Sequence, residues 1–84
     1  MKEKTQNLIR LTMNRIKREV IRENKGIGRN VSDKKWLNLL REDLQTRFNH
    51  GKIFTTESFS ELFDSNGSVN EKNTKMYLDN YFSN

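Results

Sequence analysis

The chain lacks cysteine, proline and alanine, and it has a single histidine and a single tryptophan. Without cysteine it can form neither a disulfide nor a thiolate metal site, which fits a reducing compartment, so we expect a cytoplasmic protein. Proline interrupts helices by removing a backbone donor, and its absence favours helices over a proline-rich linker. No cofactor or metal is expected.

Long apolar runs are also missing from the sequence. No segment approaches the roughly 18–20 apolar residues that a membrane-spanning helix needs, so we expect no membrane insertion. Eighty-four residues with 32% hydrophobic composition suffice for one small core, and we expect a single domain over residues 1–84. A core of this size supplies little net stability, which a dimer contact would increase.

The positive charge is concentrated in the first third of the chain. Residues 1–31 carry nine Lys and Arg against three Glu, whereas residues 51–84 carry three Lys against five acidic residues. This separation indicates either a polyanion such as DNA or an acidic protein surface as the partner. The abundance of Lys and Asn, with no Ala, is typical of AT-rich genomes, including those of many phages and mobile elements.

Within residues 1–24 a basic amphipathic helix is predicted, which runs from Thr5, its N-cap, to about Asn24, with Gly26 as its stop. Leu8 and Leu11 flank its apolar seam. The seam recurs at spacings of four, three and four residues: Ile9, Met13, Ile16 and Val20. The seam would either dock on the next helix or form a dimer contact, and we favour the dimer. A basic stripe lies on another face, formed by Arg15, Arg18, Arg22 and Lys25, with Lys17 and Arg29 extending it.

A loop over residues 25–31 is predicted to lead into a central core helix at residues 32–50. Ser32 is the expected N-cap, and Gly51 is expected to end the helix. His50 is interpreted as a C-terminal cap, because no second histidine or cysteine could join it in a metal site. Apolar side chains recur every four residues on one face: Trp36, Leu40, Leu44 and Phe48.

Two further helices are predicted in residues 55–82, after a brief strand or extended connection at residues 52–55. Thr55 or Thr56 would cap the first, which would run to about Asp64, and the capping box from Ser68 to Glu71 would open the second. The predicted fold is all-α, a small four-helix domain with at most one short strand. We expect one core, made by Trp36, Leu40, Leu44, Phe48, Phe59, Leu62, Phe63, Leu78 and Phe82.

The last two helices carry a family resemblance. Residues 54–63, a glycine-containing turn and residues 69–78 resemble the helix-turn-helix and winged-helix DNA-binding domains. In that family the second helix presents its polar N-terminal half to the major groove. The resemblance implies that Val69, Leu78 and Phe82 anchor this helix to the core. It also implies a groove-facing set of Asn70, Lys72, Asn73, Thr74 and Lys75.

No catalytic constellation is present, so an enzyme is not expected. We interpret Glu57 and Glu61, four residues apart, as solvated charges rather than an acid/base pair. The function that we favour is a small DNA-binding regulatory protein of a phage or mobile element, acting as a homodimer on duplex DNA. The alternative is a phage accessory protein that binds an acidic protein surface and inhibits or retimes a host or phage protein. The expected nucleic-acid contacts are Arg15, Lys17, Arg18, Arg22, Lys25, Arg29, Asn70, Lys72, Asn73 and Lys75.

Overall fold

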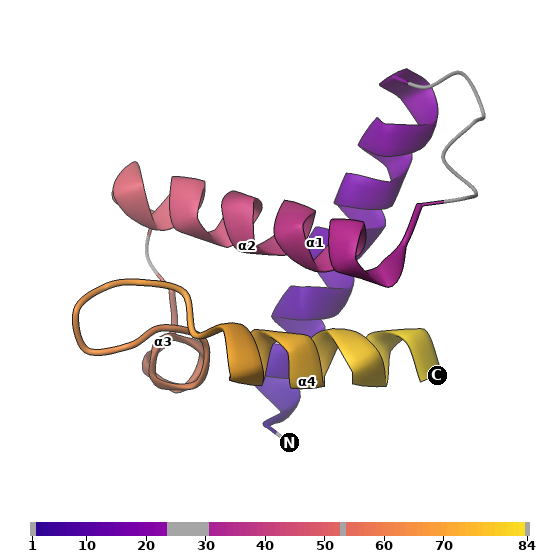
Figure 1. The fold of residues 1–84 in the computed structure, drawn as a ribbon. Coiled ribbons are helices and arrows are strands. Elements are labelled where there is room, and N and C mark those ends of the chain that lie inside the picture. Colours follow the sequence, from indigo (N-terminus) through magenta and orange to yellow (C-terminus); the bar gives the residue numbers. More distant parts are fainter. Residues whose placement is uncertain (1, 24–30, 53, 84) are drawn as a thin grey trace.

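The structure, a computed structural model, describes residues 2–23, 31–52 and 54–83 (Figure 1). These residues form the four helices α1 (Glu3–Glu23), α2 (Asp33–Asn49), α3 (Thr56–Leu62) and α4 (Glu71–Ser83). The predicted all-α fold is therefore confirmed. Within the described ranges the only β pairing is an isolated bridge between Phe63 and Val69. The predicted loop at 25–31, and with it Gly26 as the predicted end of the first helix, lies almost entirely outside the described residues.

Helix α1 is the element around which the other three are arranged. It contacts α2, α3 and α4, and α4 in turn contacts both α2 and α3. In Figure 1, α2 and α4 run across the view one above the other, α1 crosses behind them, and α3 is seen end on. The core lies where these helices cross.

The apolar seam of α1 is buried inside the chain. Ile9 and Met13 are fully buried, Ile16 is 5% exposed, and Val20 packs against the same cluster. Leu62, Tyr77 and Leu78 belong to that core, so α3 and α4 supply the apolar surface that the seam needs. A dimer contact through this seam, which the sequence led us to favour, is therefore not how these side chains are covered.

The start of α1 differs from the prediction. The helix begins at Glu3, so Thr5 is not its N-cap. Thr5 is fully buried, and its hydroxyl donates to Ser58 Oγ at 3.4 Å. The backbone N–H of Lys2 donates to the Tyr77 hydroxyl at 3.0 Å, which ties this end of the helix to α4.

Helix α2 follows the prediction closely. Ser32 caps it, accepting from the Lys35 N–H at 3.2 Å, and His50 is the C-cap. Gly51 follows with φ +75°, a conformation that favours glycine. The buried residues of α2 include three of the four predicted core residues, and the fourth is partly buried in a phenylalanine cluster. That cluster consists of Phe48, Phe54, Phe59 and Phe63, with ring centroids 5.1–5.8 Å apart.

The segment between α2 and α4 departs from the prediction at two helix ends. Thr55 caps α3 as predicted, but the helix ends at Leu62 rather than near Asp64. Ser68 does not cap α4. Asn70 does, because its Oδ1 accepts from the Asn73 N–H at 2.9 Å. Backbone bonds across the turn, including Asn70 N to Leu62 O at 2.7 Å, hold this segment extended until Asn70.

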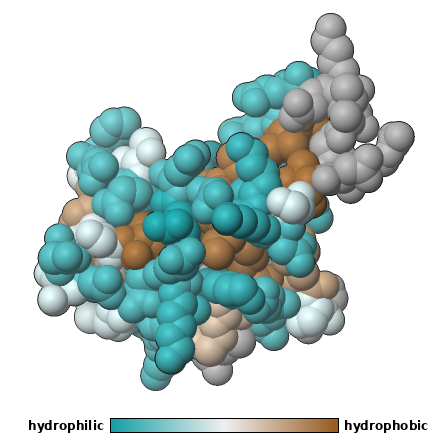
Figure 2. Space-filling view, in the orientation of Figure 1, coloured by the Kyte–Doolittle hydropathy of each residue, from teal (hydrophilic) through white to brown (hydrophobic). Residues whose placement is uncertain are grey.

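The core differs from the predicted one at the end of α4. Phe82 is 41% exposed, so it does not anchor α4. Tyr77, at 1% exposure, takes that place, because its ring lies on the buried face and its hydroxyl accepts from Lys2. Figure 2 shows hydrophilic side chains over most of one face, with hydrophobic ones between α2 and α4 and beside the C-terminal end of α1.

Candidate binding surface

Helix α1 has a second regular face, which points away from the core except at Leu8, a partly buried residue that packs against it. Its members follow one another at spacings of four, three, four, three and four residues: Lys4, Leu8, Leu11, Arg15, Arg18 and Arg22. We call this set the outer seam. It contains four basic residues, two leucines and no acidic residue. Leu11 is 60% exposed, the highest value among the large apolar side chains that the structure describes.

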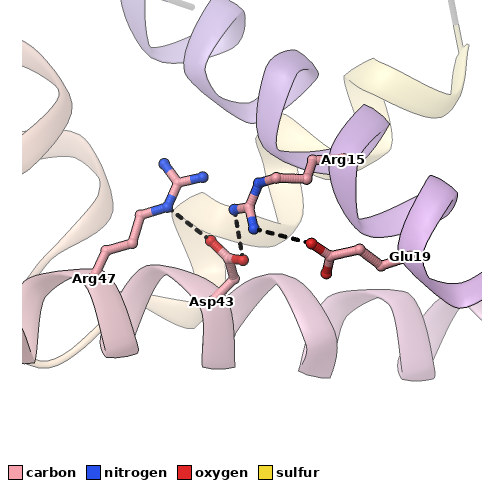
Figure 3. Close-up of polar contacts among 4 residues, drawn as sticks. All are labelled: Arg15, Glu19, Asp43 and Arg47. Carbon is pink, nitrogen blue, oxygen red and sulfur yellow. Dashed lines mark hydrogen bonds and ion pairs between the residues drawn. The ribbon is translucent and has the colours of Figure 1, made fainter.

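Arg15 of the outer seam holds α1 to α2 (Figure 3). Its Nη2 donates to Asp43 Oδ2 at 2.7 Å, and its Nη1 lies 3.5 Å from Glu19 Oε1. Arg47 Nε lies 3.0 Å from the other oxygen of Asp43 as an ion pair. The Asp43 side chain is only 15% exposed between the two guanidinium groups. The guanidinium group of Arg15 therefore already has acidic partners within the chain.

The other basic residues predicted to contact DNA differ in their exposure and in their partners within the chain. Arg18 and Arg22 are exposed, and neither forms an ion pair with another described residue. The Lys17 ammonium lies 5.4 Å from the centre of the Tyr81 ring, a cation–π distance. Lys25 and Arg29 lie outside the described residues.

The polar half of α4 is largely committed to contacts within the chain. The Asn70 side chain caps α4 and donates to Asp64 Oδ1 at 2.8 Å. The Asn73 amide donates to the Glu61 carbonyl at 2.8 Å. Thr74 is fully buried, so the expectation that it faces a DNA groove is wrong. These groups position α4 on α3.

The two lysines of α4 are exposed. A hydrogen bond from Lys75 Nζ to Asp79 at 2.8 Å raises the pKa of Lys75 above its usual value. Lys72 makes no ion pair with the residues that the structure describes. Beside them Glu71 lies 3.6 Å from Arg41, and this face of α4 carries no net positive charge.

An apolar groove lies between the first half of α1 and the segment that joins α2 to α3. Its volume is about 550 Å³. We call it the basic groove, because three of its lining residues are cationic and none is acidic. The lining consists of Lys4, Asn7, Leu8, Leu11, Arg47, Lys52, Phe54, Thr55 and Ser58.

Sequence reasoning predicted three members of the outer seam, Arg15, Arg18 and Arg22, as a basic stripe, but it missed the continuation of that face through Leu11, Leu8 and Lys4, and it missed the basic groove. It noted Leu8 and Leu11 only as flanks of the buried seam. The signal that could have found the outer seam is the second run of alternating three- and four-residue spacings in the same helix. The groove could not have been found in this way, because it needs Lys52 and Phe54 brought against α1 by the fold.

The described residues hold no cluster of three or more His, Asp or Glu side chains that could bind a metal ion. None of the four helices combines the length and the hydropathy needed to cross a membrane. Comparisons of the chain with protein-family models, with curated protein sequences and with solved structures found no match.

Proposed function

We propose that this is a binding protein without enzymatic activity, which holds an acidic partner protein against the outer seam of α1 and thereby inhibits or retimes that partner. One observation carries the proposal: Leu11 is exposed midway between Lys4 and Arg18, and none of the six residues of the outer seam is acidic. Protein interfaces combine an apolar centre with a polar rim, and charge of one sign selects a partner of the other.

This mixed surface supports a protein partner better than it supports duplex DNA. Phosphate contacts need charge and reach, and an exposed leucine adds nothing to them. Base reading requires free amide or cationic groups at the groove. The Asn70 and Asn73 side chains already have partners within the chain, which weighs against base reading by α4.

Duplex DNA is a second candidate, in a form that needs no base reading. Exposed cations without ion pairs among the described residues support it: Lys4, Arg10, Arg18 and Arg22 on α1. The formal net charge of +5 points the same way. In this form the protein would bind phosphates of any sequence, and regulation would come from occupancy rather than from a specific site.

A pair of charge-matched variants tests the proposal. Arg18→Gln/Arg22→Gln removes two charges from the outer seam, and Lys34→Gln/Lys35→Gln removes two from exposed positions at the start of α2. Affinity capture from the native host, quantified by mass spectrometry, should yield an acidic protein with the wild type and the α2 variant but not with the seam variant.

The same three proteins are titrated against random duplex DNA. A duplex shifted at low salt by the wild type, and not by the seam variant, would establish the second candidate. Equal capture of the partner by both variants would reject the outer seam as the binding face.

A further inference from the structure

We infer that the basic groove receives an acidic amphipathic helix of the partner protein, with its apolar side chains on the groove floor and its carboxylates at the rim. This inference rests on the proposed function, since it names the recognition element of the same partner. Helix-in-groove recognition of this kind uses apolar anchors at positions i, i+3 or i+4, and i+7.

The floor of the groove favours apolar occupants. Leu8, Leu11 and Phe54 line it, and the Phe54 ring is held 5.1 Å from Phe63 in the phenylalanine cluster. The two hydroxyls of the lining already have partners: the Thr55 hydroxyl accepts from the Ser58 N–H at 3.2 Å and donates to Ser58 Oγ at 3.1 Å. Since these groups do not depend on water, filling the groove with apolar side chains leaves neither hydroxyl newly unsatisfied.

The length of the groove suits a short helix. Lys4 and Leu11 are seven residues apart on α1, which is about 10 Å along the helix axis. Two turns of a partner helix lying along α1 cover the same distance, so anchors at i and i+7 would reach both ends. A volume of about 550 Å³ is in the range of pockets that hold several apolar groups.

The cationic residues at the rim of the basic groove favour a partner helix with negative charge. Lys4 and Lys52 are exposed and form no ion pair with described residues, so both ammonium groups are available. Arg47 turns Nε toward Asp43 and keeps its remaining guanidinium donors for a second carboxylate. Because no acidic residue lines the groove, a basic helix would be repelled by the three cations there, and a neutral helix would leave them without partners.

A second copy of this chain does not offer the required helix among its described residues. α3 is acidic but exposes no large apolar side chain. α4 exposes Met76 and Phe82, but its two acidic residues are balanced by two lysines. The occupant is therefore expected to come from a different protein.

A peptide selection tests the inference even while the partner is unidentified. The full chain is immobilised and a displayed library of random peptides of about 12 residues, three helical turns, is selected on it. We expect enriched peptides to combine Leu, Ile, Phe or Met at helical spacing with several Asp or Glu. Selection of no peptide, or of peptides without acidic residues, would overturn the inference.

Matched variants then locate the bound peptide. A synthetic enriched peptide, labelled with fluorescein, should bind Leu11→Glu and Lys4→Glu/Lys52→Glu at least tenfold more weakly than wild type. The controls Ile21→Glu and Lys34→Glu/Lys35→Glu should bind it as wild type does. Ile21 is 52% exposed on the same helix but outside the groove, so it controls for folding. Equal binding by the groove variants and their controls would place the peptide elsewhere.

The outcomes separate this inference from the proposed function. If Arg18→Gln/Arg22→Gln and Leu11→Glu release the native partner while Lys4→Glu/Lys52→Glu retains it, the proposed function holds and the groove inference fails. If neither set releases the partner, both fail. If the groove variants release it and their controls do not, the inference is supported.

Discussion

At the scale of single residues, Asp43 joins two helices through ion pairs with two arginines. Its carboxylate is 15% exposed and lies between Arg15 of α1 and Arg47 of α2. Hydrogen bonds between ionised groups are shorter and stronger than those between neutral ones. The residue thus fixes the crossing of α1 over α2 next to the basic groove.

Replacing this carboxylate by an amide should destabilise the fold. Asp43→Asn keeps the size of the side chain but leaves two guanidinium groups facing a neutral group, which should lower the free energy of unfolding by about 1–3 kcal/mol. Urea unfolding followed by circular dichroism measures it. The control is Asp79→Asn, which breaks an exposed pair with Lys75 and should leave the midpoint unchanged. Equal shifts in the two variants would mean that the Asp43 cluster is no stronger than a surface pair.

Two glycines with positive φ give a second matched comparison. At Gly51 (φ +75°) an added Cβ would meet nothing within 4 Å, whereas at Gly67 (φ +86°) it would lie 3.0 Å from the Phe48 ring. Gly51→Ala should cost about 1–2 kcal/mol from the left-handed conformation alone. Gly67→Ala should cost more, because the phenylalanine ring must also move. Thermal unfolding of both variants checks the order, and a larger loss at Gly51 would contradict the described turn.

At the scale of elements, α1 has two faces with different tasks. One face carries Ile9 and Met13 into the core, and the other carries Leu11 and the arginines to the surface. The spacing of apolar residues marks Ile9 and Met13 as the face to be covered, but it does not say whether that face packs within the chain or in a dimer. The apolar surface that the other helices present in the fold decides it.

Truncation of one apolar side chain on each face should separate these tasks. Ile9→Ala removes a fully buried side chain and should destabilise the chain by about 2–5 kcal/mol. Leu11→Ala removes one that is 60% exposed and should change the free energy of unfolding by less than about 0.5 kcal/mol. Urea unfolding of both variants gives the comparison. A large loss for Leu11→Ala would mean that the outer seam is a core face.

The spacing of apolar residues was enough to predict that each helix forms. The ends of the helices could be predicted only where the capping side chain bonds to a backbone N–H a few residues away. Ser32 and Thr55 cap their helices through a backbone N–H three residues on, and the sequence shows both partners. Thr5 and Ser68 look like equally good caps in the sequence. Neither residue caps its helix. Thr5 instead bonds to Ser58, which is far away in the sequence, and the backbone bonds across the turn at residues 62–70 delay the start of α4 beyond Ser68.

At the scale of the whole molecule, the segregation of charge could be predicted from the sequence, but the set of basic side chains that stay exposed and unpaired could not. Arg15 belongs to the basic stripe, yet its partner Asp43 is 28 residues away on another helix. Asn73 likewise finds the carbonyl of Glu61. What remains exposed after such pairings is a smaller basic surface with a leucine in it, and this surface motivates the proposal of an acidic partner protein.

The central claim is that the exposed face of α1 binds through its leucine as well as its charges. The most direct test is the affinity of wild type and Leu11→Ala for the captured partner and for random duplex DNA. This substitution removes apolar surface and no charge. We predict about tenfold weaker binding to the partner, or about 1.4 kcal/mol, and no tight binding to duplex DNA. Tight binding to duplex DNA that is the same for both proteins would contradict the account.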